Sequence, residues 1–251
     1  MTLSRVASCE PLGPYAQVRL ERTFAPGAPG QFHMVRPLAH AGLLARPLSA
    51  VASDDASVTF LCQPGTGALA SLAQVGAEAE VIGPFGRGFD AGSAGAAPVL
   101  VGGGFGVALL APLSRLLPGA PLLAAFRDAQ AARAAELVPA AEREIALPPG
   151  NVLDALAARL ASASCVLAAG PDGLVRAVAA ACAAAGVPCQ VALEAPMACG
   201  YGACYGCAVS LGGALVRLCV EGPVVSGDRL AAARAPISAR ASAQWRSITR
   251  S

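Results

Sequence analysis

Lysine is missing from this chain of 251 residues, and aromatic and charged residues are scarce. All 18 basic residues are arginine, the formal net charge is only +2, and no run of basic residues occurs. Binding to nucleic acid therefore has no electrostatic support in the sequence. The absence of lysine beside abundant alanine is typical of a GC-rich genome and says little about function.

The sequence also lacks a continuous hydrophobic run that would form a membrane helix, although 55% of its residues are hydrophobic. Two uncharged stretches, 91–114 and 195–216, reach the length of about 20 residues that a bilayer requires. Glycines and prolines interrupt the first stretch, cysteines interrupt the second, and no arginine pattern flanks either. These interruptions argue against membrane insertion. Because residues 1–5 contain no apolar signal segment, we also expect no export, and we expect the protein to reside in the reducing cytoplasm.

A set of catalytic side chains is missing as well. The chain has two histidines, His33 and His40, and no Ser/His/Asp set or pair of acidic residues with matched spacing. The sequence therefore predicts no catalytic residue. The chemistry would be that of bound cofactors, which the protein positions and tunes.

The first region, residues 1–93, has the pattern of a small β domain. Short alternating segments are separated by glycine and proline, at 15–20, 31–35, 57–61 and 79–82. Several short strands at this spacing predict a small antiparallel barrel.

The second region, residues 97–194, alternates between strands and helices. Buried strands are expected at 98–101, 121–126, 164–169 and 189–193, with helices near 130–136 and at 174–185. This alternation predicts parallel βαβ units. Pro112 lies inside the first expected helix and should kink or shorten it. The third region, residues 195–251, is expected to contain little regular structure and to depend on a metal for its order.

Four cysteines in the third region carry most of the information. Cys199, Cys204, Cys207 and Cys219 have the spacing C-x4-C-x2-C followed by eleven residues and a fourth cysteine. This is the plant-type spacing for a 2Fe-2S cluster, and the intervening glycines permit the sharp turns that a loop around a cluster needs. A zinc site and structural thiols remain alternatives, although zinc favours paired hooks and nine cysteines do not fit a disulfide framework. The other five cysteines are expected to be small buried hydrophobic residues.

Two segments of the first region have residues suited to a flavin nucleotide. In Arg46-Pro47-Leu48-Ser49, the arginine can grip a pyrophosphate with two N–H groups, and Ser49 can hydrogen-bond a ring nitrogen. Further on, Gly65-Thr66 opens a short helix and offers backbone N–H groups to phosphate. A surface turn and an ordinary capped helix are the respective alternatives.

Glycine-rich turns follow two of the expected parallel strands. Gly102, Gly103, Gly104 and Gly106 lie between a strand and a helix, which is the context of a dinucleotide phosphate loop, although Val107 breaks the G-x-G-x-x-G pattern. Gly170-Pro171 ends another strand at the same edge of the predicted sheet, where ligands bind in open α/β folds. Tight turns without a ligand are the alternative for both.

Taken in order, these elements resemble one family, the electron transfer subunit of NAD-dependent (B-form) dihydroorotate dehydrogenase. The resemblance spans nearly the whole chain. It is carried by Arg46-Pro47-Leu48-Ser49, Gly65-Thr66, Gly83-Pro84-Phe85-Gly86-Arg87-Gly88-Phe89, Gly102-Gly103-Gly104-Phe105-Gly106 and Met197-Ala198-Cys199-Gly200-Tyr201-Gly202-Ala203-Cys204-Tyr205-Gly206-Cys207.

The resemblance implies a ferredoxin-reductase-like fold with an FAD-binding barrel at 1–93, an NAD-binding α/β domain at 97–194 and a 2Fe-2S region at 195–251. It also implies a partner, an FMN-containing catalytic subunit that oxidises dihydroorotate to orotate in pyrimidine synthesis, with two copies of each subunit. Electrons would pass from FMN through the cluster and FAD to NAD.

The same resemblance implies roles for particular residues. The four cysteines would ligate iron. FAD would be held by Arg46, Pro47, Leu48, Ser49, Leu61, Cys62, Gln63, Gly65 and Thr66.

The chain departs from the family at the expected nicotinamide site. Relatives often carry a cysteine where this chain has Ala169, and Pro112 is displaced within the helix after the phosphate loop. Arg127 would suit a 2′-phosphate and Asp128 a ribose hydroxyl, which leaves NAD against NADP undecided. A related reductase subunit serving a hydrogenase or a ferredoxin-dependent transhydrogenase, and a non-redox zinc-binding module, are the alternative functions.

Overall fold

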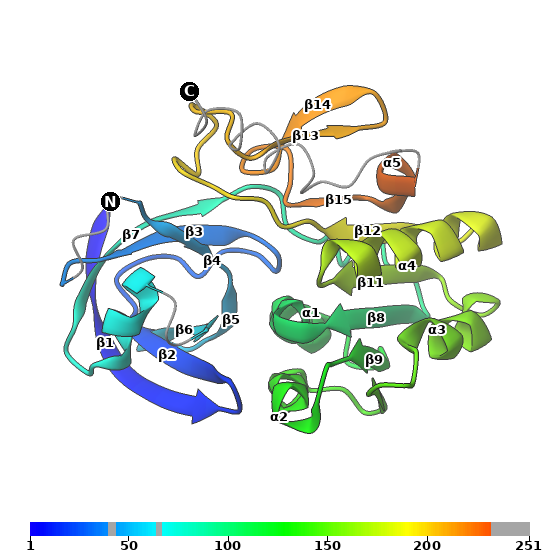
Figure 1. Cartoon of the computed structure of the whole chain (residues 1–251), viewed down its shortest axis with the longest axis horizontal. Helices are drawn as coiled ribbons and strands as arrows, with labels where there is room; N and C mark the ends of the chain where they lie inside the picture. The colour runs from blue at the N-terminus through cyan, green and yellow to red at the C-terminus, as the bar shows by residue number, and fades with distance from the viewer. Residues whose placement is uncertain (40–43, 64–66, 232–251) are drawn as a thin grey trace.

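The computed structural model describes residues 1–39, 44–63 and 67–231. A curled antiparallel sheet and a layered α/β unit lie side by side, and the segment after β12 runs across the top of both (Figure 1). None of the helices in these ranges is long and apolar enough to cross a bilayer.

The antiparallel sheet has seven strands in the order β4-β3-β7-β1-β2-β6-β5. Their bounds are β1 Thr2–Leu12, β2 Tyr15–Glu21, β3 Phe32–Pro37, β4 Arg46–Leu48, β5 Ala50–Ser53, β6 Ser57–Cys62 and β7 Glu78–Phe85, with the 3-10 helix η1 at Gly67–Ala73. Alternating residues such as Val18 and Leu20 point inward and pack with Phe60 and Leu72. The predicted barrel with strands β2, β3, β6 and β7 is confirmed, whereas β1, β4 and β5 were not predicted.

The second sheet has the order β10-β9-β8-β11-β12-β15, in which all neighbours are parallel except β12 and β15. Its strands are β8 Pro98–Gly103, β9 Leu122–Ala125, β10 Arg143–Ala146, β11 Cys165–Ala169, β12 Cys189–Ala192 and β15 Val224–Ser226. The strand order reverses between β8 and β11. The carboxyl ends of these two strands therefore form the edge at which open α/β sheets bind ligands.

Helices cover both faces of this sheet, so its central strands are almost entirely hydrophobic. Leu100 of β8 packs toward one face, and Val99 and Val101 pack toward the other. The helical segments are η2 Gly104–Leu110, α1 Ala111–Leu116, α2 Ala129–Ala132, η3 Arg133–Leu137, α3 Val152–Leu160, α4 Asp172–Ala185 and α5 Gly227–Ala231. Pro112 lies in the first turn of α1, which a 3-10 segment precedes, so the expected shortening of this helix is confirmed.

The two halves share one hydrophobic core. Leu12, Tyr15, Val51 and Leu61 of the antiparallel sheet belong to the same cluster as the buried face of η2 and α1. Arg115 of α1 adds a hydrogen bond of 3.0 Å to the carbonyl of Val51. The orientation of the halves is therefore fixed by packing rather than by a linker alone.

The C-terminal segment contains more regular structure than the sequence indicates. A hairpin of β13 Ala208–Leu211 and β14 Ala214–Arg217 follows the cysteine loop. The chain then returns to the α/β unit, where β15 adds to β12 as an antiparallel edge strand. In the sequence, the four motif cysteines therefore lie between β12 and β15, two neighbouring strands of one sheet.

Candidate functional site

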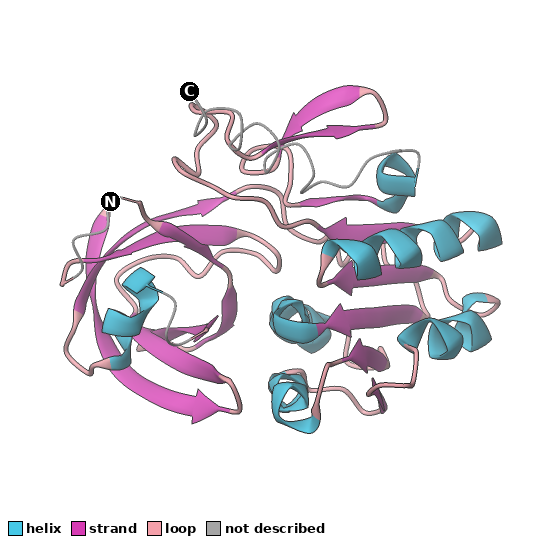
Figure 2. Cartoon of the chain, in the orientation of Figure 1, coloured by secondary structure: helices cyan, strands magenta, loops and turns pink. Residues whose placement is uncertain are grey.

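The first three cysteines of the motif lie in the segment that joins β12 to β13. Figure 2 shows this segment as a loop. Gly200 in this loop has a φ of +80° and lies directly on Met34 of β3, so that a side-chain Cβ there would collide with Met34 Cγ. The loop is therefore seated on the antiparallel sheet. Cys207 precedes β13 and Cys219 follows β14. Both belong to the hydrophobic cluster that also contains residues of the parallel sheet.

The four thiols form two neighbouring pairs. Cys199 lies close enough to Cys204 to interact with it, as Cys207 does to Cys219, and Cys199 and Cys219 also interact electrostatically. Cys207 and Cys219 are 3% and 2% exposed, whereas Cys204 is exposed. In the described ranges, no three His, Cys, Asp or Glu side chains gather closely enough to hold one metal ion.

The electrostatics of the two pairs differ. Burial opposes ionisation of Cys199, but the backbone N–H groups of Cys204, Tyr201 and Ala203 and the Cys204 thiol outweigh it and lower the pKa of Cys199 to about 6. Burial, together with Cys207, raises the pKa of Cys219 to about 12. A two-iron cluster takes four thiolates, so two adjacent pairs suit it better than a single zinc ion, which needs its ligands around one point.

A cavity of about 240 Å³ lies beside the cysteine loop, between the two halves of the molecule. Pro47, Leu48, Ser49 and Leu61 form its wall on the antiparallel sheet. The opposite walls come from η2 and from the segment after β12, through Phe105, Ala108, Leu109, Leu193, Glu194, Ala195 and Met197. A mostly apolar slot with a few polar groups is suited to a flat aromatic ring system.

The other residues predicted for the flavin site lie elsewhere. Arg46 is exposed at the start of β4, next to the cavity wall but not part of it. Cys62 packs in the core of the antiparallel sheet, where burial raises its pKa to about 12. Gln63 is exposed. Gly65 and Thr66 lie outside the described residues.

Most of the lining residues were not assigned to the flavin site from the sequence, and Phe105, Glu194 and Met197 are three of them. Phe105, inside the glycine-rich turn, reaches into the cavity and meets the Tyr15 ring edge-on at 5.7 Å. Glu194 is exposed as a whole, yet the protein around its carboxyl group desolvates it and raises its pKa. Met197 lies two residues before Cys199. Of these three residues, only Phe105 has a local sequence signal, because it lies between two glycines.

The two glycine-rich turns meet at the carboxyl edge of the parallel sheet. A Cβ on Gly106 would lie 2.5 Å from the Cα of Gly170, and one on Gly103 would collide with Leu174 of α4. These glycines therefore allow the turns and α4 to pack closely, as Gly102 does against Val107. Gly104, with a φ of +50°, has open space around its Cα, and it is the position where a ligand can approach the backbone.

Asp128 and Arg127 follow β9 at the same edge. The Asp128 carboxylate accepts the backbone N–H of Ala131 and caps α2, and Arg127 Nε pairs with it at 3.0 Å. The hydrogen bond from Ala131 is the main reason that the pKa of Asp128 is lowered. Ala169 ends β11 and is fully buried, next to Gly170.

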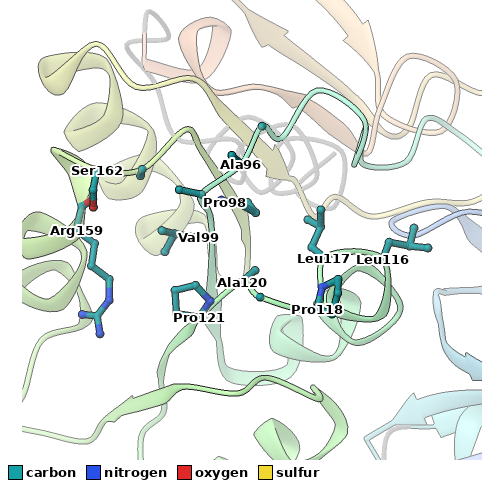
Figure 3. A pocket seen from close by; sticks show the side chains of 14 residues that line it. Ala96, Pro98, Val99, Leu116, Leu117, Pro118, Ala120, Pro121, Arg159 and Ser162 are labelled. Carbon is teal, nitrogen blue, oxygen red and sulfur yellow. The ribbon is translucent and has the colours of Figure 1, made fainter.

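A larger cavity, of about 470 Å³, lies at the opposite edge of the parallel sheet. Ser162 and Arg159 line one side of it, and Leu116, Leu117 and Pro118 line the other (Figure 3). It contains none of the residues singled out in the sequence, and Arg159 is already paired with Glu142 and Glu144. Its position at the amino ends of β8 and β9 is not the ligand-binding edge of such a sheet.

Comparisons with known proteins bear directly on this arrangement. Residues 194–231 match the iron-sulfur cluster binding domain of dihydroorotate dehydrogenase B, a range that includes all four cysteines. Electron transfer subunits of dihydroorotate dehydrogenase B (NAD(+)) from Clostridium acetobutylicum and Geobacillus thermodenitrificans are 31% and 33% identical to this chain. These matches cover 80% and 78% of this chain and 85% and 84% of the relatives.

The chain belongs to the family of electron transfer subunits of dihydroorotate dehydrogenase B. As a member of this family it is an oxidoreductase component, which confirms the resemblance found in the sequence. The structure of an NADH-dependent reduced ferredoxin-NADP oxidoreductase is similar, with a TM-score of 0.76, 20% identity, and coverage of 93% of this chain and 95% of that one. The structure of a ferredoxin reductase in carbazole 1,9a-dioxygenase is also similar, with a TM-score of 0.61 and 22% identity. The match covers 74% of this chain and 65% of that one. The predicted ferredoxin-reductase-like fold is thus confirmed.

Proposed function

We propose that this dihydroorotate dehydrogenase B subunit carries electrons between an FMN-containing catalytic subunit and NAD, through a 2Fe-2S cluster and FAD, in the cytoplasm. The catalytic subunit would oxidise dihydroorotate to orotate in pyrimidine synthesis, and two copies of each subunit would assemble. When bound, the cluster passes single electrons and the flavin exchanges one or two, which connects this carrier to the two-electron chemistry of NAD.

One observation carries the proposal. The segment Leu193–Met197 forms a wall of the interdomain cavity and continues directly to Cys199. An extended chain advances at most about 3.6 Å per residue, so the Cα of Cys199 lies within about 7 Å of the Cα of Met197. A flavin ring in the cavity and a cluster on the thiols would therefore be neighbours.

Within the cavity, Pro47, Leu48 and Leu61 would pack against the flavin ring, and the Ser49 hydroxyl would hydrogen-bond a ring nitrogen. Phe105, braced by Tyr15, closes the opposite side and excludes water. Arg46 lies at the exposed margin, where its charge would meet the pyrophosphate. Cys62 and Gln63 remain part of this proposal as strand contacts to FAD, and Gly65 and Thr66 as the residues that hold its phosphates.

For NAD, Gly102, Gly103, Gly104 and Gly106 with Gly170 and Pro171 form the proposed site. The open space at Gly104 supports it, since a phosphate could approach the backbone there. The division into an FAD domain at 1–93, an NAD domain at 97–194 and a cluster region at 195–251 is proposed on the same grounds.

The FMN subunit is proposed to dock around the exposed thiol pair. Tyr201 and Tyr205 are 61% and 54% exposed on the cysteine loop, and Leu215 on β14 and Val220 after it are exposed as well. Exposed aromatic and aliphatic side chains of this kind form the centres of protein interfaces. Leu215→Ser should weaken binding of the FMN subunit, whereas Leu116→Ser, an equally exposed leucine on α1, should not; equal affinities would contradict this docking surface.

The proposal is tested by anaerobic purification followed by iron, zinc and flavin analysis, and then by mixing with the FMN subunit of dihydroorotate dehydrogenase. We expect two irons and one FAD per chain, an electron paramagnetic resonance signal after reduction, and NAD reduction that depends on dihydroorotate. Cys204→Ser should abolish the signal, and Arg46→Ala should lower FAD retention. A colourless protein that contains zinc would overturn the proposal.

A related reductase subunit is the second candidate, favoured by the likeness to NADH-dependent reduced ferredoxin-NADP oxidoreductase. In that case the cofactors would be retained while the FMN subunit would produce no dihydroorotate-dependent NAD reduction. Reduced ferredoxin supplied in its place would then support nicotinamide reduction.

A further inference from the structure

Arg217, the last residue of β14, contacts the cysteine loop at two points. Its Nη1 donates to the carbonyl oxygen of Gly202 at 3.3 Å, and its guanidinium lies over the Tyr205 ring at 5.1 Å. Behind it, Glu221 accepts the Arg217 backbone N–H at 2.6 Å and lies 3.6 Å from Nε. The guanidinium is thus fixed between the loop on one side and a carboxylate on the other.

The peptide group that Arg217 contacts also faces a thiol. The Gly202 carbonyl belongs to the same peptide unit as the N–H of Ala203, and that N–H favours the thiolate form of Cys199. A positive charge on the carbonyl side polarises the peptide and strengthens the N–H on the other side. The backbone N–H of Gly202, which belongs to the preceding peptide unit, interacts with Cys219, so the residue that Arg217 contacts lies between the two thiol pairs.

The same contacts hold the loop in shape. Tyr205 has a φ of +57° and is the one non-glycine residue of the described ranges with a positive φ. Left-handed backbone is unfavourable at a residue with a Cβ, and stacking of Tyr205 on a guanidinium offsets part of that cost. Gly202, at +91°, is packed against Val220. Arg217 therefore lies where it can act on both the geometry and the electrostatics of the cysteine site.

We propose that Arg217 is a positioning residue that fastens the cysteine loop and raises the reduction potential of the cluster bound there. This inference rests on the proposed function, because it requires a cluster on the four cysteines. One-electron reduction adds negative charge to a site that already carries four thiolates. A fixed positive charge beside the loop stabilises the reduced form more than the oxidised form, and hydrogen bonds to the sulfurs act in the same direction.

Glu221 gives the proposal an internal test of sign. Its carboxylate partly neutralises Arg217, so Glu221→Gln should leave more of the positive charge uncompensated while an amide oxygen still accepts the Arg217 backbone N–H. Removing the charge of Arg217 and removing the charge of Glu221 should therefore shift the potential in opposite directions. A purely structural clamp would not produce this opposition.

The experiment is a redox titration followed by electron paramagnetic resonance on anaerobically purified full-length protein, with iron measured for each variant. Arg217→Gln should make the cluster harder to reduce, by about tenfold in the equilibrium constant, which is about 59 mV for a one-electron couple. Arg217→Lys should keep a potential near that of the wild type but bind less iron, because lysine lacks the planar fork. Glu221→Gln should raise the potential, and Arg229→Gln on α5 is the matched control for loss of an arginine.

The outcomes separate this inference from the function on which it rests. Wild-type potentials in both Arg217→Gln and Glu221→Gln, with iron retained, would overturn it and leave the cluster assignment intact. If Arg217→Gln binds no cluster, the reduction potentials of Glu221→Gln and Arg217→Lys test the inference instead. Potentials that change with the iron content of the variants, and not with their charge, would contradict it. A wild-type protein without iron would defeat the proposed function itself.

Discussion

The two thiol pairs of the cysteine site are built in different ways. Cys207 and Cys219 flank a β-hairpin and are buried in the hydrophobic cluster that includes the parallel sheet. Cys199 and Cys204 belong to a loop whose backbone N–H groups surround the Cys199 thiol and whose Gly200 rests on Met34. One pair is positioned by side-chain packing and the other by backbone hydrogen bonds and close contact.

This difference separates stability from cofactor retention. Changes at the hairpin pair remove buried groups from a core, so they should affect the fold with or without metal. Changes at the loop pair alter a partly exposed turn, so they should affect mainly the cluster. The following predictions can confirm or contradict that division.

Cys207→Ser should give the largest effect, because it places a hydroxyl in a hydrophobic cluster and also removes a ligand. We expect the cluster to be lost and the free energy of unfolding of the metal-free protein to fall by about 1–3 kcal/mol. Cys204→Ser should also lose the cluster but change the unfolding free energy by less than about 0.5 kcal/mol. Urea denaturation of metal-free protein measures both values, and equal losses would contradict the division.

Gly200→Ala should weaken cluster binding while the hairpin stays folded. The substitution adds a Cβ at a φ of +80° and drives it into Met34. Gly213→Ala in the hairpin turn is the matched control, because its φ is +83° but open space surrounds its Cα. Iron content well below that of Gly213→Ala would show that contact with β3 seats the loop, and equal iron content would show that it does not.

Acid should weaken the strand that supports the loop. His33 on β3 is fully buried, its Nε2 lies 2.8 Å from the Ala25 carbonyl oxygen, and its Nδ1 has no hydrogen-bond partner among the described residues. Burial lowers the pKa of His33, so the unfolded chain takes up a proton near pH 6.5 that the folded chain resists. Stability is thus fully present above about pH 6.5 and falls as the pH drops below it.

His33→Gln removes this proton linkage and should give a flatter stability profile between pH 7.5 and pH 5. Urea midpoints of metal-free wild type and variant across that range provide the measurement. Every other residue is common to the two proteins, so the difference between their profiles reports on His33. Parallel profiles for the two would show that His33 does not control the acid sensitivity of β3.

Local patterns in the sequence explain which parts of the fold could be predicted. Residues 15–20 and 57–61 alternate in hydrophobicity, and residues 98–101 and 164–169 form short hydrophobic runs, so these strands were found. β1 puts Ser4 on its inward face, and β15 has only three residues, so neither gives a clear period. The polar inward residue is satisfied by the Glu21 carbonyl oxygen, a partner 17 residues away.

The same limit applies to the site. The cysteine spacing is local and indicates the cluster directly. Other contacts of the site are between segments that are far apart in the sequence. Gly200 packs against Met34, and Glu194 and Met197 line the same cavity as Ser49. Arg217 likewise has no motif of its own. Its importance follows from the hairpin, which turns the end of β14 back toward Gly202.

The edge strand β15 has a consequence for how the protein is made. Because it follows all four cysteines in the chain, the parallel sheet cannot gain its last strand until the ribosome has released the whole cluster segment. A product that stopped before Val224 would leave the backbone of β12 open along one side, a surface prone to aggregate. Completion of the parallel sheet is thereby coupled to synthesis of the segment that carries the four cysteines.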